Sequence, residues 1–230
     1  MIPAEALRVF DCTRPKTRVG KPNDGGYVIA HNVPFEGLAG WEYDHFLSGG
    51  IANENSFECG ILDMYPNLIC HAFDPSGGAG SSHDRYHFFA QPVEYMGLSL
   101  CHNALVKLDI ERAEWPWLKG LTMTAASSIA QLVMELHSPH VPESGWNWEH
   151  LAWISTKHVL IHAHANNWDG IVDAGGARVP GTIECTWLRR DLAGPITRRR
   201  DPIPSPLDQP NDPSKPDHVV DWEPFIEVVP

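Results

Sequence analysis

Residues 44–54 read DHFLSGGIANE and residues 69–74 read ICHAFD, and together they are the most informative part of the chain. The order predicts a strand that runs into a glycine turn, then a helix, then a second strand that ends in an acid. A doubly wound α/β domain holds an adenosine-containing ligand in this way, because glycines let the backbone approach the ligand and the acid accepts hydrogen bonds from ribose hydroxyls. The interval from Gly50 to Asp74 is close to the expected spacing of about 20 residues. The glycines do not follow the G-x-G-x-x-G pattern, so a nicotinamide or flavin cofactor is not indicated.

Length and composition favour a soluble protein with a substantial core. The chain has 230 residues, of which 43% are hydrophobic, and this fits one large domain or one domain with a long tail. No run approaches the roughly 18 apolar residues that span a bilayer. The start of the chain, MIPAEALRVFDCTRP, lacks the basic and apolar regions of a secretion signal. The five cysteines show no C-x-x-C spacing, which argues against a disulfide framework. We therefore expect a cytoplasmic protein with no membrane partner.

The charge balance bears on possible partners. Twenty-nine acids stand against 17 bases, which gives a net charge of −12. Most of such a surface repels a phosphate backbone, so a nucleic-acid partner is not expected. Basic residues cluster only at 189–190 and 198–200, which fits either solvated surface or contact with an anionic substrate. The sequence does not indicate the oligomeric state.

Strands and helices alternate from residue 45 onward, as a βαβ protein requires. The predicted strands lie near residues 45–50, 69–73, 86–90, 104–109, 129–136, 158–164 and 182–190. The predicted helices lie near residues 53–65, 114–119 and 147–156. The Asp-Gly-Gly sequence at 24–26 predicts a turn between two extended segments.

We expect three parts along the chain, an N-terminal cap (1–43), the α/β domain (44–200) and a C-terminal strap (201–230). Six prolines between residues 202 and 216 exclude a helix or a central strand there. Apolar residues return at 219–225, which predicts a strap that packs on the domain.

Polar residues at the ends of predicted strands mark a candidate cleft. In open parallel sheets, ligands bind just beyond the carboxyl ends of the strands. Asp109 ends one apolar run, and Glu135 and His137 end the next. We expect these three side chains, together with His164, to point into one shared cleft.

Four blocks of the sequence, taken in order, resemble class I S-adenosylmethionine-dependent methyltransferases, and in particular the FkbM-type and related methyltransferase-like proteins. The blocks are DGGY at 24–27, FLSGGI followed by NSFE within 46–58, FDPS at 73–76 and VKLDIERAEW at 106–115. Weaker agreement follows at 131–137, 164–168 and 179–184, so the resemblance covers roughly residues 18–210. It implies a Rossmann-like, doubly wound and mostly parallel seven-stranded sheet.

The resemblance also implies S-adenosylmethionine as the cofactor. Residues 48–50 would form the turn beneath its methionine part, and Glu58 would hold that turn or the amino group. Asp74 would bind the ribose hydroxyls and Ser76 would border the adenine, while the segment at 24–25 would fold over the cofactor. The candidate cofactor-binding residues are Asp24, Gly25, Ser48, Gly49, Gly50, Glu58, Asp74, Ser76 and Asp109.

Methyl transfer from a sulfonium is an in-line displacement by an acceptor on an already activated donor. Alignment and exclusion of water contribute roughly 7–11 kcal/mol, and a base that deprotonates a hydroxyl acceptor adds about 10²–10⁴-fold. The candidate bases are His137, His164, Asp109 and Glu135, with the histidines first because they need less tuning near neutral pH. The expected function is O-methylation of a small, hydroxylated, sugar-like acceptor.

Metal binding and two alternative functions stay open from the sequence. The same four side chains could hold a divalent metal such as magnesium, but their spacing lacks a signature such as H-E-x-x-H and metal is not favoured. The alternative functions are a binding module that keeps the fold without catalysis, and a metal-dependent hydrolase.

Arg112 stands where the family usually has a glycine, which would permit a close approach or an unusual backbone angle. This departure bears on the substrate more than on the fold.

Overall fold

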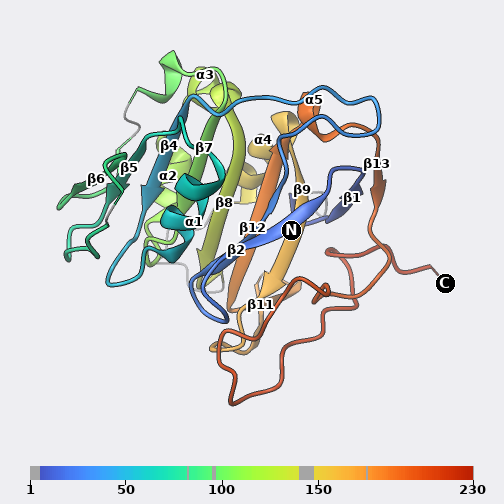
Figure 1. Ribbon diagram of the computed structural model, residues 1–230. Coiled ribbons are helices and arrows are strands. Elements are labelled where there is room, and N and C mark those ends of the chain that lie inside the picture. The colour runs from blue at the N-terminus through green and yellow to red at the C-terminus, as the bar shows by residue number, and fades with distance from the viewer. Residues whose placement is uncertain (1–5, 82, 95–96, 140–147, 175, 230) are drawn as a thin grey trace.

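The computed structural model describes residues 6–81, 83–94, 97–139, 148–174 and 176–229, and a seven-stranded sheet forms its centre (Figure 1). The strands are β4 (His45–Gly49), β5 (Cys70–Phe73), β6 (Tyr86–Phe89), β7 (Ala104–Leu108), β8 (Ile129–His137), β9 (His158–Ala165) and β12 (Thr182–Arg189). Their order across the sheet is β6-β5-β4-β7-β8-β12-β9. The pairs from β6 to β8 are all parallel, whereas β12 is antiparallel to both β8 and β9. The expected doubly wound, mostly parallel sheet is confirmed.

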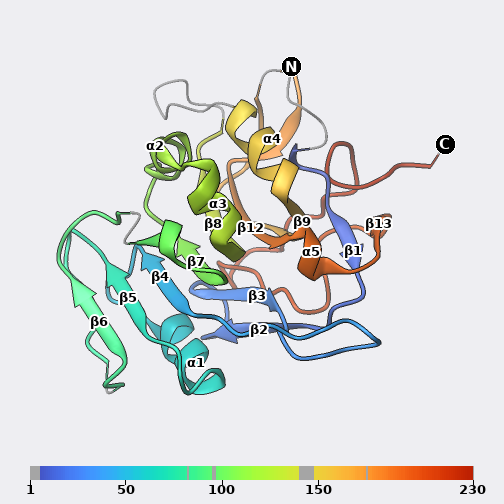
Figure 2. The ribbon, with the colours of Figure 1, turned by 90° about the horizontal axis from the view of Figure 1, so that it is seen from above.

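Helices cover one face of the sheet, and a helix with a hairpin covers the other (Figure 2). The helices are α1 (Ser56–Met64), η2 (Leu98–Leu100), α2 (Glu114–Gly120), α3 (Met123–Ser128), α4 (Trp148–Lys157) and α5 (Arg190–Ala193). Side chains alternate between the faces of a strand, so Phe46 packs with α1 while Leu47 packs with α2, α3 and α4. The sheet is therefore buried on both sides, which suits its apolar parallel strands.

Three small two-stranded sheets complete the described structure. Strands β2 (Lys16–Gly20) and β3 (Gly26–Ala30) form an antiparallel hairpin, which confirms the predicted turn at 24–26. Strand β1 (Phe10–Cys12) pairs with β13 (Ile196–Arg198), and β10 (Ile171–Asp173) pairs with β11 (Arg178–Pro180). The hairpin matters for the site because β3 packs across β8 and β12 while β2 packs on α1.

The seven predicted strands of the main sheet are present, with ends that differ by a residue or so. The first helix begins at Ser56 rather than near residue 53, because Asn55 is its N-cap and has a non-helical backbone with φ of −131° and ψ of 22°. Helix α3 was not predicted; Thr122 caps it by accepting a hydrogen bond from Ala125 N at 3.2 Å. The start of the predicted helix at residue 147 lies outside the described residues.

The C-terminal residues 201–229 form no strand or helix within their described part apart from an isolated bridge between Ile203 and Val220. They nevertheless contribute to the core, because Ile203, Val220 and Phe225 are 2%, 1% and 1% exposed. Val9 N donates a hydrogen bond of 2.9 Å to Phe225 O, which ties this segment to the N-terminal residues. Among the described residues, no helix has the length and apolar character needed to cross a bilayer.

The burial of Phe225 gives a first prediction. The substitution Phe225→Ala should lower the free energy of unfolding by about 3–5 kcal/mol, since it removes a fully buried ring and leaves a cavity. Val219→Ala is the control, because Val219 is 58% exposed and its change should stay within about 0.5 kcal/mol. Urea denaturation measures both; equal effects would contradict a core role for the C-terminal segment.

Candidate active site

A cleft of about 1170 Å³ opens beyond the carboxyl ends of β4, β5 and β7. Strand order reverses between β4 and β7, and ligands of open α/β sheets bind at this switch point. The turn of the β2–β3 hairpin and the start of α2 complete the walls. The lining residues are Lys21, Asp24, Gly25, Tyr27, Gly50, Ile51, Ala52, Glu54, Phe57, Glu58, Phe73, Asp74, Pro75, Ser76, Pro92, Val93, Glu94, Gly97, Ser99, Lys107, Asp109, Ile110, Glu111, Ala113, Pro116 and Trp117.

The glycine turn after β4 is packed against its neighbours. Gly50 has a φ of +78°, and a Cβ there would stand 1.5 Å from the carbonyl oxygen of Asp109, so only glycine fits. Its N–H donates to Phe73 O at 2.9 Å, and its carbonyl accepts from Lys107 Nζ at 2.6 Å. A Cβ at Gly49 would stand 2.9 Å from Val93. The turn is thus fixed to both adjacent strands.

Ser48 and Glu58 form a buried pair beneath this turn. The Ser48 hydroxyl donates to Glu58 Oε1 at 2.5 Å, and the two residues are 0% and 1% exposed. Burial raises the pKa of Glu58, against the opposing effects of the Lys107 charge and the Ser48 hydrogen bond. Glu58 lines the cleft, whereas Ser48 is enclosed behind it and holds Glu58 in place.

Asp74 uses both carboxylate oxygens within the protein. Oδ2 accepts from the backbone N–H groups of Ile51 (2.9 Å) and Ala52 (2.8 Å), and Oδ1 accepts from the N–H (2.7 Å) and hydroxyl (2.6 Å) of Ser76. Burial alone would raise the pKa of Asp74, but these four hydrogen bonds outweigh it and hold the pKa below its usual value. The ionised carboxylate therefore shapes the cleft wall that the two loops form.

The residues predicted at the ends of β7 and β8 are brought together. His137 Nε2 lies 3.7 Å from Asp109 Oδ1 and 4.0 Å from Glu135 Oε1. The Tyr27 hydroxyl lies 3.0 Å from Asp109 Oδ2 and 3.3 Å from Glu135 Oε2. On the far side of the ring, His137 Nδ1 lies 3.0 Å from Glu114 Oε1. Of Asp109, Glu135 and His137, only Asp109 lines the cleft directly. Glu135 and His137 stand behind Asp109.

The electrostatics of this group follow from burial and crowding of acids. Burial lowers the pKa of His137, but the hydrogen bond and charge of Glu114 and the charges of Glu135 and Asp109 raise it to about 9. Burial, together with the charge of Asp109, raises the pKa of Glu135 well above its usual value. In this geometry the imidazole carries a proton at neutral pH and balances part of the acidic charge.

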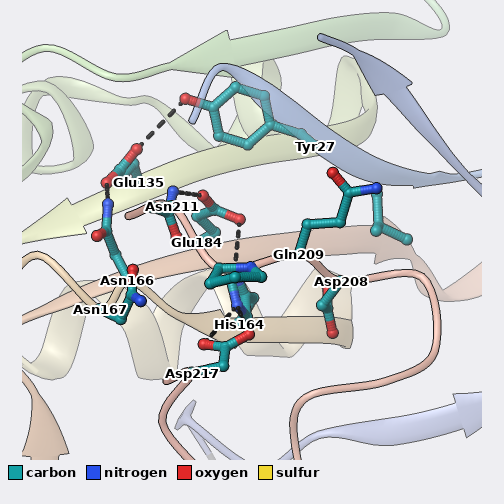
Figure 3. A network of polar contacts seen from close by, with 12 residues as sticks. Tyr27, Glu135, His164, Asn166, Asn167, Glu184, Asp208, Gln209, Asn211 and Asp217 are labelled. Carbon is teal, nitrogen blue, oxygen red and sulfur yellow. Dashed lines mark hydrogen bonds and ion pairs between the residues drawn. The ribbon is translucent and has the colours of Figure 1, made fainter. Parts of the chain in front are cut away.

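His164 contacts other acids than His137 does, and Figure 3 shows its ring between Glu184 and Asp217, with Glu135 and Tyr27 farther along the same group of polar residues. It is 2% exposed, and its two ring nitrogens lie 3.1 Å from Glu184 Oε2 and 2.9 Å from Asp217 Oδ2. Burial lowers its pKa, but the hydrogen bonds of Asp217 and Glu184 raise it to about 10. The expectation that His164 shares a cleft with Asp109 is therefore not what the structure shows, because the ring is enclosed between β12 and the C-terminal segment.

The sequence did not identify several polar residues that the structure places at the site. Tyr27 lies in the DGGY block, and the alternation of side chains along β3 was the available signal for it. Glu114 Oε1 accepts a hydrogen bond from Ile110 N at 2.8 Å and also faces His137 Nδ1 at 3.0 Å. Asn166 Nδ2 donates to Glu135 Oε1 at 2.7 Å, a contact across two strands that no local pattern reveals. Asp24 and Gly25 line the cleft.

Arg112 occupies the strained rim of the cleft. Its φ is +80° and that of Glu111 is +52°, both in the left-handed region. The side chain points to Ser138, where Nε donates to Oγ at 3.2 Å. The unusual backbone angle that a glycine would permit is thus present, although the residue is arginine.

The sequence matches no family model, and no curated protein matches it significantly. Similar solved structures include fibrillarin in its complex with Nop5p (TM-score 0.38, 9% identity, 63% of this chain and 72% of that one). Others are the antibiotic-resistance methyltransferase Kmr (0.37, 14%, 64% and 88%) and a 16S rRNA (adenine(1408)-N(1))-methyltransferase from Catenulisporales acidiphilia (0.32, 10%, 64% and 89%). At these scores and identities, nothing about activity passes from those proteins to this one.

The strand order itself gives the class of fold. The last strand of the sheet, β12, lies antiparallel between β8 and β9, and the remaining strands follow the doubly wound order. The protein therefore has a Rossmann-like, doubly wound α/β fold.

The backbone at Arg112 leads to a second prediction. Arg112→Gly should be more stable than Arg112→Ala by about 1 kcal/mol, because both remove the same side chain but only glycine adopts φ of +80° without a steric penalty. Guanidinium denaturation of the two variants measures the difference. If the alanine variant were equally stable, the rim would not hold this backbone angle.

The environment of His164 gives a prediction about pH. Its folded pKa of about 10 lies above the unfolded value of about 6.5. Its stabilising contribution is therefore complete below pH of about 6.5 and is lost as the pH rises through 10. The free energy of unfolding should fall between pH 7 and 10 more steeply in the wild type than in His164→Gln. Urea titrations across this range test it, with the partly exposed His83→Gln as control; parallel curves for wild type and His164→Gln would contradict it.

Proposed function

We propose that the protein is an S-adenosylmethionine-dependent methyltransferase that methylates a hydroxyl group of a small, sugar-like molecule. The observation that carries this proposal is the arrangement of the cleft at the switch point. A glycine turn without room for a side chain lies under one part of it, and the ionised Asp74 stands at the end of the next strand. A carboxylate that lines the cleft, Asp109, stands on the other side.

The cofactor would lie across the ends of β4 and β5. Asp74 and Ser76 would border the adenosine, with the ribose hydroxyls competing for the Asp74 carboxylate. Gly50 and Glu58 would border the methionine part, and the hairpin turn at 24–25 would cover it. The lining contains seven acidic residues and two lysines, and this negative field favours a sulfonium cation.

The acceptor would enter beside Asp109. The cleft of about 1170 Å³ exceeds the roughly 300–1,000 Å³ of a pocket for one small ligand, so a second small molecule fits next to the cofactor. The same negative field disfavours a polyanionic acceptor such as RNA. In the reaction, the Asp109 carboxylate would take the proton of the acceptor hydroxyl, the acceptor oxygen would bond to the methyl carbon while the carbon–sulfur bond breaks, and S-adenosylhomocysteine would leave as a neutral thioether. Asp109 is the residue that we propose to contact the acceptor, and Glu135 and His137 stand behind it.

Cofactor binding gives the next prediction. Asp74→Asn should weaken the binding of S-adenosylhomocysteine about tenfold or more, because it removes a charged acceptor from the cleft. Asp44→Asn is a matched control, since Asp44 also accepts two backbone N–H groups, those of His102 and Asn103, but lies outside the cleft. Isothermal titration measures affinity, and thermal unfolding shows whether each variant is folded.

The outcomes separate the candidate functions. Absence of S-adenosylhomocysteine binding at millimolar concentration would rule out the proposed cofactor. Binding without release of S-adenosylhomocysteine, across a panel of hydroxylated acceptors with and without divalent metal, would favour a binding module that does not catalyse methyl transfer.

A further inference from the structure

We propose that Asp109, Glu135 and His137 bind one divalent transition-metal ion, of the Mn²⁺ or Zn²⁺ class, at the acceptor side of the cleft. One oxygen or nitrogen from each residue lies within 4.8 Å of the others. Two ligand atoms that are each about 2.1 Å from a common ion lie at most about 4.2 Å apart. The separations of 3.7 and 4.0 Å between His137 Nε2 and the two carboxylates already satisfy this limit.

The ring nitrogen that faces the acids is placed for a metal rather than for a hydrogen bond. Three carboxylate oxygens, from Asp109, Glu111 and Glu135, surround His137 Nε2 at 3.7 to 4.0 Å. These distances are too long for N–H···O hydrogen bonds, which lie between about 2.7 and 3.2 Å. An ion between His137 Nε2 and the oxygens of Asp109 and Glu135 would contact all three residues at once.

Each proposed ligand is also held from behind by a second polar group. Glu114 Oε1 lies 3.0 Å from His137 Nδ1, so Nε2 is the nitrogen left to face the site. The Tyr27 hydroxyl lies 3.0 Å from the distal oxygen of Asp109. Asn166 Nδ2 donates to Glu135 at 2.7 Å. A carboxylate behind a ligating histidine, with further hydrogen bonds to the ligating acids, is the usual outer shell of a protein metal site.

The donor set indicates the kind of ion. One imidazole with two carboxylates suits Mn²⁺, Fe²⁺ or Zn²⁺, whereas Mg²⁺ prefers oxygen ligands alone. The linear sequence gave no metal signature because the ligands come from two neighbouring strands. Glu135 and His137 are two residues apart on β8 and share a face, and Asp109 follows the adjacent β7.

The ion would have a defined part in the proposed methyl transfer, and this part rests on the proposed function. A hydroxyl bound to a divalent ion loses its proton to water far more readily. The resulting metal-bound oxygen would form the bond to the methyl carbon as the carbon–sulfur bond breaks. The ion would thereby take over the task that a free histidine base was expected to perform.

Metal binding can be tested without cofactor or acceptor, so its failure is distinguishable from failure of the proposed function. Protein purified without a histidine tag and dialysed against a chelator is titrated with MnCl₂, ZnCl₂ or MgCl₂ by calorimetry, and Mn²⁺ is also followed by electron paramagnetic resonance. We expect one Mn²⁺ or Zn²⁺ per chain and weaker binding of Mg²⁺. No Mn²⁺ or Zn²⁺ binding at millimolar concentration would overturn the proposal.

Single substitutions test whether Asp109 and His137 are the metal ligands. Asp109→Asn and His137→Gln should each weaken binding more than tenfold, and Glu114→Gln, which only orients the histidine, should weaken it about 10–100-fold. His83→Gln is the control, because His83 pairs with Asp63 at the surface, away from the cleft, and it should leave the affinity unchanged. If His137→Gln does not fold, Asp109→Asn still decides, since the Asp109 side chain is 28% exposed. Unaltered affinity in the folded Asp109 variant would overturn the assignment.

Discussion

The contact between Gly50 and the carbonyl group of Asp109 is the constraint on which the site depends. Because Gly50 has no side chain, the end of β4 lies directly against the end of β7, and Asp109 N donates to Gly49 O at 3.0 Å. On the other side, Gly50 N donates a hydrogen bond to Phe73 O of β5. One residue without a Cβ therefore brings Asp74 and Asp109, which follow different strands, to the same cleft.

The second constraint is the concentration of negative charge in that cleft. Asp74 is stabilised by four donors from its own loops, so its charge is satisfied within the structure. Glu135 is different, because it is 4% exposed and faces other acids. Burial and the charges of Asp109 and Glu184 disfavour the ionised form of Glu135, which raises its pKa. Such an arrangement is typical of functional sites, and structural stability alone gives no reason for it.

Much of the fold could be predicted from local pattern, because apolar runs, glycine turns and strand-end acids are all short-range signals. Residues 45–49 and 70–74 are examples, and the position of Asp74 followed from them. The details of the site are set by pairs that are distant along the chain. Tyr27 with Glu135, and His164 with Asp217, meet only because the hairpin and the C-terminal segment fold back on the sheet. His164 was misplaced for this reason, since its strand end gave no sign that residue 217 would cover it.

The position of β12 within the sheet has a consequence for how the chain folds as it is synthesised. Strand β9 lies at the edge of the seven-stranded sheet and pairs with β12, which is made later and separates it from β8. A nascent chain that ends before residue 182 leaves β8 with an open edge and β9 without its neighbour in the sheet. Unpaired, apolar strand edges promote association between chains. Protection from aggregation therefore requires the synthesis of residues 182–189, which pair with β8 and β9 after both of these strands have been made.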